Sequence, residues 1–175
     1  RLDAHKLIEE MMIQANVCAA ETLEKHKVPL VYRIHDAPSL EKLESLREFL
    51  GSLDISLRKA GALRPSQFNT ILARVADTPN QTMVNEVVLR SQSQAEYNPV
   101  NIGHFGLNLR RYAHFTSPIR RYADLIVHRA LIRALRLGPD GLPETIDDKL
   151  EAIGAEISGA ERRAMAAERD TIDRL

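Results

Sequence analysis

Apolar side chains recur every three or four residues along most of the chain, the spacing that places them on one face of a helix. One long stripe runs from residue 3 to residue 27, and Pro29 ends it. Ser39 is a predicted N-cap, and Gly51 is the predicted stop of the helix that follows. The other predicted helices cover residues 40–50, 65–77, 79–90, 118–137 and 145–174.

Strand-like patterns are short and few. Residues 30–35, LVYRIH, form a β-like run, and residues 102–109 alternate weakly, as in a strand or a strand-like loop. A possible short strand at 55–57 lies inside a predicted loop over 52–64, and the polar residues 91–99 predict another loop. So few strands cannot form a sheet that is stable alone. We therefore predict an α+β, predominantly helical fragment that neighbouring structure completes.

The composition limits the function classes. Lysines and arginines balance acids at 24 each, and 27% charged residues is typical of a soluble protein. Aromatic residues make up only 5% and Trp is absent, so a base-stacking sheet is not expected. Cys18 stands alone in an apolar run, which predicts a buried structural thiol in a reducing compartment. No apolar run approaches the roughly 18 residues of a membrane span.

Both ends of the chain lie inside helical patterns. The sequence starts at Arg1 without Met and stops at Leu175 before its last helical pattern ends. This is the expectation for a piece excised from a larger protein.

The stretch HFTSPIRRY, residues 114–122, places two cations at a predicted helix start. Ser117 would be the N-cap and Pro118 the first helical residue. Arg120 and Arg121 would then lie in the first turn, where each positive charge costs about 0.3–1 kcal/mol. A bound phosphate would reverse that cost, because free backbone N–H groups and arginine forks both suit phosphate oxygens. The pattern predicts a phosphate site.

Residues 101–136 hold seven arginines against a single acid, Asp124. Such a local excess is typical of a polyanion-binding surface, although a solvated arginine-rich helix face is an equal alternative. Arg120, Asp124 and His128 are spaced to share one helical stripe, so Asp124 is predicted to pair with both neighbours. The predicted surface contains Arg110, Arg111, Arg120, Arg121, Arg129, Arg133 and Arg136.

No metal site is predicted. The spacings of His104, His114 and His128 match no compact ligand motif. The densest acids, Asp147, Asp148 and Glu151, fall at a predicted helix N-terminus, where a structural role is expected.

Residues 104–131, HFGLNLRRYAHFTSPIRRYADLIVHRAL, resemble the signature region of the ribonuclease II / ribonuclease R family. Three flanking stretches resemble the same family, and most of all its bacterial ribonuclease R branch. They are EEMMIQANVCAA at 9–20, LVYRIHDAPS at 30–39 and AERRAMAAERD at 160–170. The resemblance implies that residues 1–175 are the C-terminal part of an RNB catalytic domain from a cytoplasmic bacterial protein.

The family resemblance implies a processive 3′→5′ exoribonuclease that hydrolyses single-stranded RNA to nucleoside 5′-monophosphates with a divalent metal, normally Mg²⁺. The first arginine of SPIRR, here Arg120, would stabilise charge on the attacked phosphate. Glu9 resembles a residue that contacts the sugar near the RNA 3′ end, and Glu168 one near the terminal nucleotide. Further RNA contacts are implied for His114, Thr116, Ser117, Arg121 and Arg129.

The chain also departs from the family pattern. The run of aspartates that binds metal, the aromatic clamp and the OB-type RNA-binding domains have no counterpart in these 175 residues. We therefore expect the Mg²⁺ ligands to lie outside this chain, and the chain alone to be inactive. We expect the parent protein to be a monomer that binds single-stranded RNA. It is not expected to bind DNA or a membrane. The alternatives are a non-catalytic RNA-binding module of RNB-like fold, and a DNA-binding protein with residues 118–137 as its recognition helix.

Overall fold

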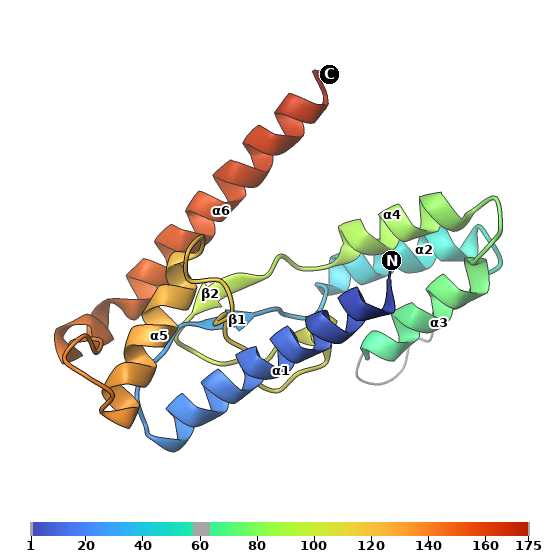
Figure 1. Ribbon diagram of the computed structural model, residues 1–175. Coiled ribbons are helices and arrows are strands. Elements are labelled where there is room, and N and C mark those ends of the chain that lie inside the picture. Colours follow the sequence, from blue (N-terminus) through green and yellow to red (C-terminus); the bar gives the residue numbers. More distant parts are fainter. Residues whose placement is uncertain (1, 58–63, 175) are drawn as a thin grey trace. The chain divides into compact units, whose positions relative to one another are not determined.

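The computed structural model describes residues 2–57 and 64–174, which divide into two compact units. The first unit takes in the described residues up to 34, residues 96–102 and residues from 110 onward. The second unit takes in residues 35–95, apart from the undescribed ones, and residues 103–109. Each unit is therefore assembled from segments that lie far apart in the sequence (Figure 1).

The first unit combines long helices with a two-stranded antiparallel sheet. Arg33 in β1 lies opposite Tyr97 in β2. The strand predicted at 30–35 is confirmed, whereas β2 falls in a run predicted to be a loop. A three-residue strand has no periodic signal, and only its pairing with a distant strand defines it. The elements are α1 (Asp3–Lys25), β1 (Tyr32–Ile34), β2 (Glu96–Asn98), α5 (Tyr122–Leu135), η2 (Glu144–Lys149) and α6 (Leu150–Ile172).

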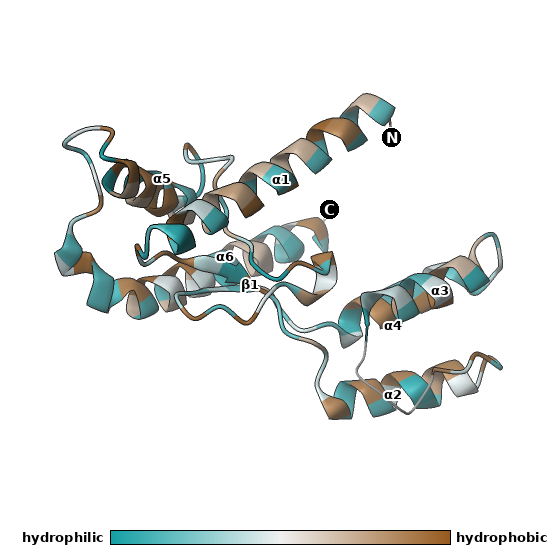
Figure 2. Ribbon diagram, turned by 90° about the horizontal axis from the view of Figure 1, so that it is seen from below, coloured by the Kyte–Doolittle hydropathy of each residue, from teal (hydrophilic) through white to brown (hydrophobic). Residues whose placement is uncertain are grey.

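The core of the first unit lies where α1, α5 and the sheet meet. Figure 2 colours most of α5 brown, in agreement with the buried Ile126, Val127 and Ala130 on this helix. Leu23 from α1 and Leu150 from the start of α6 are fully buried in the same cluster. Cys18 is exposed, because α1 buries a different face; the buried-thiol prediction is wrong.

Helix α6 lies directly against β2. A Cβ atom added to Gly154 would lie 2.5 Å from the Tyr97 carbonyl oxygen, so only glycine permits this approach. One turn later, the Ser158 hydroxyl accepts the Tyr97 N–H at 2.9 Å and donates to the Gly154 carbonyl at 2.8 Å. These contacts fix the position of α6 along the strand.

The second unit is formed by α2 (Leu40–Gly51), α3 (Pro65–Val75), α4 (Gln81–Ser91) and η1 (Phe105–Leu107). Their apolar faces meet in one cluster that includes Leu46, Phe68 and Val84. The Ser39 hydroxyl accepts the Lys42 N–H at 3.4 Å, as the N-cap prediction requires. Gly51 is the last helical residue rather than the residue after the helix.

Two further predictions for local structure were inaccurate, those for residues 55–57 and for the last helix. Residues 55–57 form no strand, and the buried Ile55 and Leu57 instead complete the apolar cluster; residues 58–63 of the predicted loop lie outside the described residues. Residues 102–109 contain η1 and single bridges at His104, which agrees with the predicted alternative of a strand-like loop. The final predicted helix is divided, because η2 precedes α6. In the described part of the chain, no helix is both long and apolar enough to cross a membrane.

Candidate functional site

The predicted helix start at residue 118 is too early, because α5 begins at Tyr122. Arg121 is its N-cap, with extended backbone at φ −126° and ψ 116°. The Ser117 carbonyl accepts the N–H groups of Arg120 at 3.3 Å and Arg121 at 3.2 Å, which closes a separate turn. The Ser117 N–H donates to the Asp124 carboxylate at 2.8 Å. The predicted placement of both arginines inside the first helical turn is therefore wrong.

The two adjacent arginines have opposite environments. The Arg121 guanidinium donates to Asp124 through Nε at 2.8 Å and through Nη2 at 2.9 Å. Asp124 is fully buried, and only 20% of the Arg121 side chain is exposed. The Arg120 side chain is exposed and forms no hydrogen bond or ion pair with any described residue. Arg120 is therefore free to bind an anion, whereas the charge of Arg121 is already compensated.

The predicted stripe of Arg120, Asp124 and His128 does not form. Arg120 precedes the helix, so the four-residue spacing no longer brings it to Asp124, and Arg121 takes that partner instead. His128 Nε2 lies 2.8 Å from the Phe115 carbonyl, and its ring stacks on that of Phe115 at 4.3 Å. His128 thereby holds the segment before the turn against α5.

Arg120 opens onto a groove in the first unit with a volume of about 760 Å³, within the usual range for ligand sites. Arg121 and Tyr122 line one side, and Tyr97 from β2 also contributes to the lining. The other wall belongs to α6, whose contribution is apolar apart from two acids. The α6 residues are Ile153, Glu156, Ile157, Ala160, Glu161 and Ala164.

One of the two acids in this wall is already paired. Glu161 accepts from the Arg33 guanidinium at 2.6 and 3.1 Å. The Arg33 guanidinium also lies over the Tyr97 ring, 4.6 Å from its centroid. Burial raises the pKa of the Tyr97 phenol, so this hydroxyl is neutral. Sequence reasoning did not find Arg33, Tyr97 or Glu161, because only tertiary structure brings their three segments together.

His114, a predicted RNA contact, belongs to a hydrogen-bonded network beside the groove. Its Nδ1 shares a hydrogen bond of 2.8 Å with the Tyr97 hydroxyl. The Tyr112 ring meets His114 edge-on, and the Tyr112 hydroxyl accepts from Asn16 Nδ2 at 2.9 Å. Asn16 Oδ1 in turn accepts the Phe115 N–H at 2.8 Å. This network ties the segment that leads to Arg120 to α1 and β2.

The arginine-rich surface is less free than its charge predicts. Arg133 forms a bidentate pair with Asp147 at 2.8 and 3.0 Å, and this hydrogen bonding raises the pKa of Arg133. Arg111 lies 3.1 Å from Glu24, and Arg129 donates to backbone carbonyls, including that of Asp140 at 3.1 Å. Of the seven arginines of this surface, Arg110, Arg120 and Arg136 are exposed and form neither a side-chain hydrogen bond nor an ion pair with a described residue.

The remaining predicted residues are more scattered. Glu9 on α1 and Glu168 on α6 are exposed, and neither is among the residues that line the groove. The Thr116 hydroxyl, next to the turn, is buried and has no hydrogen-bond partner among the described residues. The structure therefore brings Arg120, Arg121, Ser117 and Thr116 together and leaves the two acids apart from them.

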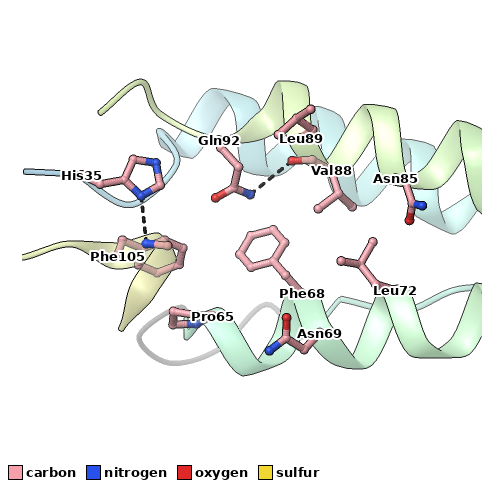
Figure 3. A pocket seen from close by; sticks show the side chains of 11 residues that line it. His35, Pro65, Phe68, Asn69, Leu72, Asn85, Val88, Leu89, Gln92 and Phe105 are labelled. Atoms are coloured by element: carbon pink, nitrogen blue, oxygen red, sulfur yellow. Dashed lines mark hydrogen bonds between the residues drawn. The ribbon is translucent and has the colours of Figure 1, made fainter. Parts of the chain in front are cut away.

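A second hollow, of about 450 Å³, lies within the second unit (Figure 3). Phe68, Leu72 and Val88 contribute apolar walls, and no charged side chain is among the described residues that line it. His35 Nδ1 accepts the Gly106 N–H at 2.8 Å, so the proton lies on Nε2, which meets the Ser93 carbonyl at 2.8 Å. This hollow offers nothing that would bind phosphate.

The described residues contain no group of three or more His, Cys, Asp or Glu side chains that could hold a metal ion. Asp147 pairs with Arg133, as expected for a structural acid, and Asp148 and Glu151 are exposed. A divalent metal therefore does not fit the residues that the structure describes.

A protein-family model described as RNB domain matches residues 1–137. The chain is 47% identical to Ribonuclease R of Escherichia coli (strain K12) over its whole length, which corresponds to 22% of that protein. Two solved structures of Mycoplasma genitalium RNase R are similar over nearly the whole chain. The apo form has a TM-score of 0.87 at 33% identity, covering 97% of this chain and 27% of that one.

The second structure is the complex with ribose methylated single-stranded RNA, which has a TM-score of 0.87 at 34% identity. It covers 98% of this chain and 28% of that one. The chain thus spans about a quarter of the length of the relatives it matches.

Proposed function

The chain belongs to the RNB domain family, and from that premise we propose that it supplies the arginine side of the active site of a 3′→5′ exoribonuclease. The proposed substrate is single-stranded RNA, and the proposed products are nucleoside 5′-monophosphates. The parent protein is proposed to be cytoplasmic and to act without DNA or a membrane.

The observation that carries the proposal is the unpaired guanidinium of Arg120 at a groove of nucleotide size. In the reaction, a water oxygen joins phosphorus and the 3′ oxygen of the shortened RNA leaves with a proton. Negative charge builds on the non-bridging phosphate oxygens. Arg120 can donate two parallel N–H bonds to these oxygens, and such bonds strengthen as charge develops.

The neighbouring groups receive supporting parts in the proposal. Arg121 and Ser117 hold the turn, since Asp124 already binds both of them. Thr116 is a further proposed RNA contact; its hydroxyl is buried and has no hydrogen-bond partner among the described residues, so RNA could reach it only if the turn moved. His114 and Arg129 shape the surface through their own protein contacts, and both are proposed to contact RNA as well.

Glu9 and Glu168 are proposed to bind the end of the RNA. The Glu9 carboxylate could accept a hydrogen bond from a ribose 2′-hydroxyl group, which would favour RNA over DNA. Both residues are exposed and on helices of the first unit, so each is accessible to a ligand.

The family resemblance implies a divalent metal, normally Mg²⁺, and no described cluster of acids fits it. We therefore assign the metal ligands to sequence outside this chain, and every step above uses only this chain's own residues. It follows that the 175-residue chain alone should not hydrolyse RNA. Release of monophosphates by the pure chain with Mg²⁺ would contradict this assignment.

The decisive experiment is Arg120→Ala in the full-length protein. Removal of one transition-state donor should lower kcat by about 10²–10³-fold, with a much smaller change in RNA affinity. Arg74→Ala is the matched control, because Arg74 is also exposed, forms no ion pair with a described residue and lies outside the arginine-rich surface. Both constants come from steady-state release of nucleotides from single-stranded RNA. An unchanged kcat for Arg120→Ala would remove Arg120 from the mechanism.

A further inference from the structure

Asp124 is a charged side chain with no exposed surface, and its two oxygens accept three hydrogen bonds. Oδ1 accepts the Ser117 N–H and one Arg121 N–H, and Oδ2 accepts the Arg121 Nε–H. A buried carboxylate is stable only when its charge and its lone pairs are satisfied in this way. Asp124 thus depends on the turn, and the turn depends on Asp124.

These bonds hold the turn at both ends. Asp124 binds the N–H of Ser117 where the turn begins and the guanidinium of Arg121 where it ends. Inside the turn, the Ser117 carbonyl accepts the N–H of Arg120. The backbone of Arg120 is therefore fixed between two points of attachment, although its side chain touches neither of them.

The same carboxylate also decides which arginine is available. Without it, two adjacent guanidinium groups would repel each other and compete for one phosphate. Asp124 compensates the charge of Arg121 alone, so Arg120 is the one cation of this turn that faces the groove without an acid partner among the described residues.

We propose that Asp124 is a positioning residue for the reaction: it acts through Arg121 and Ser117 to aim Arg120 at the attacked phosphate. The proposal rests on the proposed role of Arg120. It predicts that Asp124 matters for turnover only while Arg120 is present.

The test is a double-mutant cycle in the full-length protein. Asp124→Asn keeps the shape of the side chain but places an amide N–H group against the N–H donors of Arg121. The lost hydrogen bond should release the turn. A misplacement of about 1 Å can cost on the order of 10²-fold in rate, so kcat should fall by about that factor while KM changes little. On an Arg120→Ala background, Asp124→Asn should lower kcat by no more than about twofold. Asp148→Asn, the same change at an exposed acid, should leave kcat unaltered.

Arg121→Lys covers the case in which Asp124→Asn does not fold. Lysine still neutralises the buried carboxylate but cannot form the two-pronged contact. It should lower kcat by about tenfold, again only when Arg120 is present.

The outcomes separate the two hypotheses. Equal losses with and without Arg120, for Asp124→Asn or for Arg121→Lys, would overturn the positioning role and leave the proposed function standing. A kcat that stays within about twofold in Arg121→Lys would do the same. If Arg120→Ala itself has no effect on kcat, the proposed function and the positioning role both fail.

Discussion

The first unit buries Asn16, Asp124 and Ser158, whereas α2, α3 and α4 of the second unit meet through a cluster of apolar side chains, and the described buried polar residues of that unit are His35 and Ser91. The buried polar groups of the first unit connect distant segments: Asn16, for example, binds Tyr112 and Phe115. Apolar contacts bring helices together but tolerate small shifts, while a buried hydrogen bond specifies which atoms meet. The groove with Arg120 lies in the first unit, where buried hydrogen bonds specify the geometry.

The largest expected difference in stability between the units comes from replacing one buried side chain in each by another of nearly the same volume. Asn16→Leu removes the acceptor of the Phe115 N–H and the amide that donates to the Tyr112 hydroxyl, at about 1–3 kcal/mol for the stranded N–H and about 1 kcal/mol for the second hydrogen bond. Leu46→Met in the second unit changes only shape and should cost less than about 1.5 kcal/mol. Urea unfolding of both variants measures the two losses. Equal losses would mean that the polar contacts add nothing beyond packing.

A smaller difference is expected from adding one methyl group to a helix glycine. Gly154→Ala places a Cβ atom 2.5 Å from the Tyr97 carbonyl, so α6 must move, at about 1–3 kcal/mol. Gly51→Ala in the second unit meets no atom within 4 Å and should be neutral or stabilise by up to about 1 kcal/mol. Thermal unfolding gives the sign of each change, and a stabilising Gly154→Ala would show that α6 tolerates displacement from β2.

The sequence predicted the three long helices of the second unit better than β2 and the turn before α5 in the first. Helical periodicity and the Ser39 cap are local signals, and they located α2, α3 and α4 to within a few residues. Strand β2 was missed because it depends on a partner strand far away in the sequence. The start of α5 was missed because it depends on a side-chain contact. Arg33 and Tyr97 pair across the sheet, and the Asp124 carboxylate organises a turn where Ser117 and Pro118 suggested a helix start.

The candidate site shows the same division. The choice of Arg120 as the candidate anion-binding residue could be made from its motif. The exposure of its side chain agrees with a free anion-binding group. The contrast with Arg121 could not be predicted, because the spacing of Asp124 suits either arginine until the helix start is known. Likewise, the charge count predicted a surface of seven arginines, although Asp147 and Glu24 each pair with one of them. Pairing with acids from other segments has no sequence signal.

The smallest expected difference concerns one ion pair from each unit. Arg33 and Glu161 are 14% and 32% exposed and form two hydrogen bonds, so Glu161→Gln should cost about 1–2 kcal/mol. Arg90 and Glu86 are 76% and 56% exposed, so Glu86→Gln should cost less than about 0.5 kcal/mol.

The salt concentration should affect these two ion pairs differently. At 1 M salt the screening length is about 3 Å, so the effect of Glu86→Gln should vanish, while most of the effect of Glu161→Gln should persist because partial burial limits screening. Urea unfolding of each variant at low and high salt measures both. If the two effects shrink in parallel, the Arg33–Glu161 pair is an ordinary surface contact, and the wall of the groove is then held by Gly154 and Ser158 without help from charge.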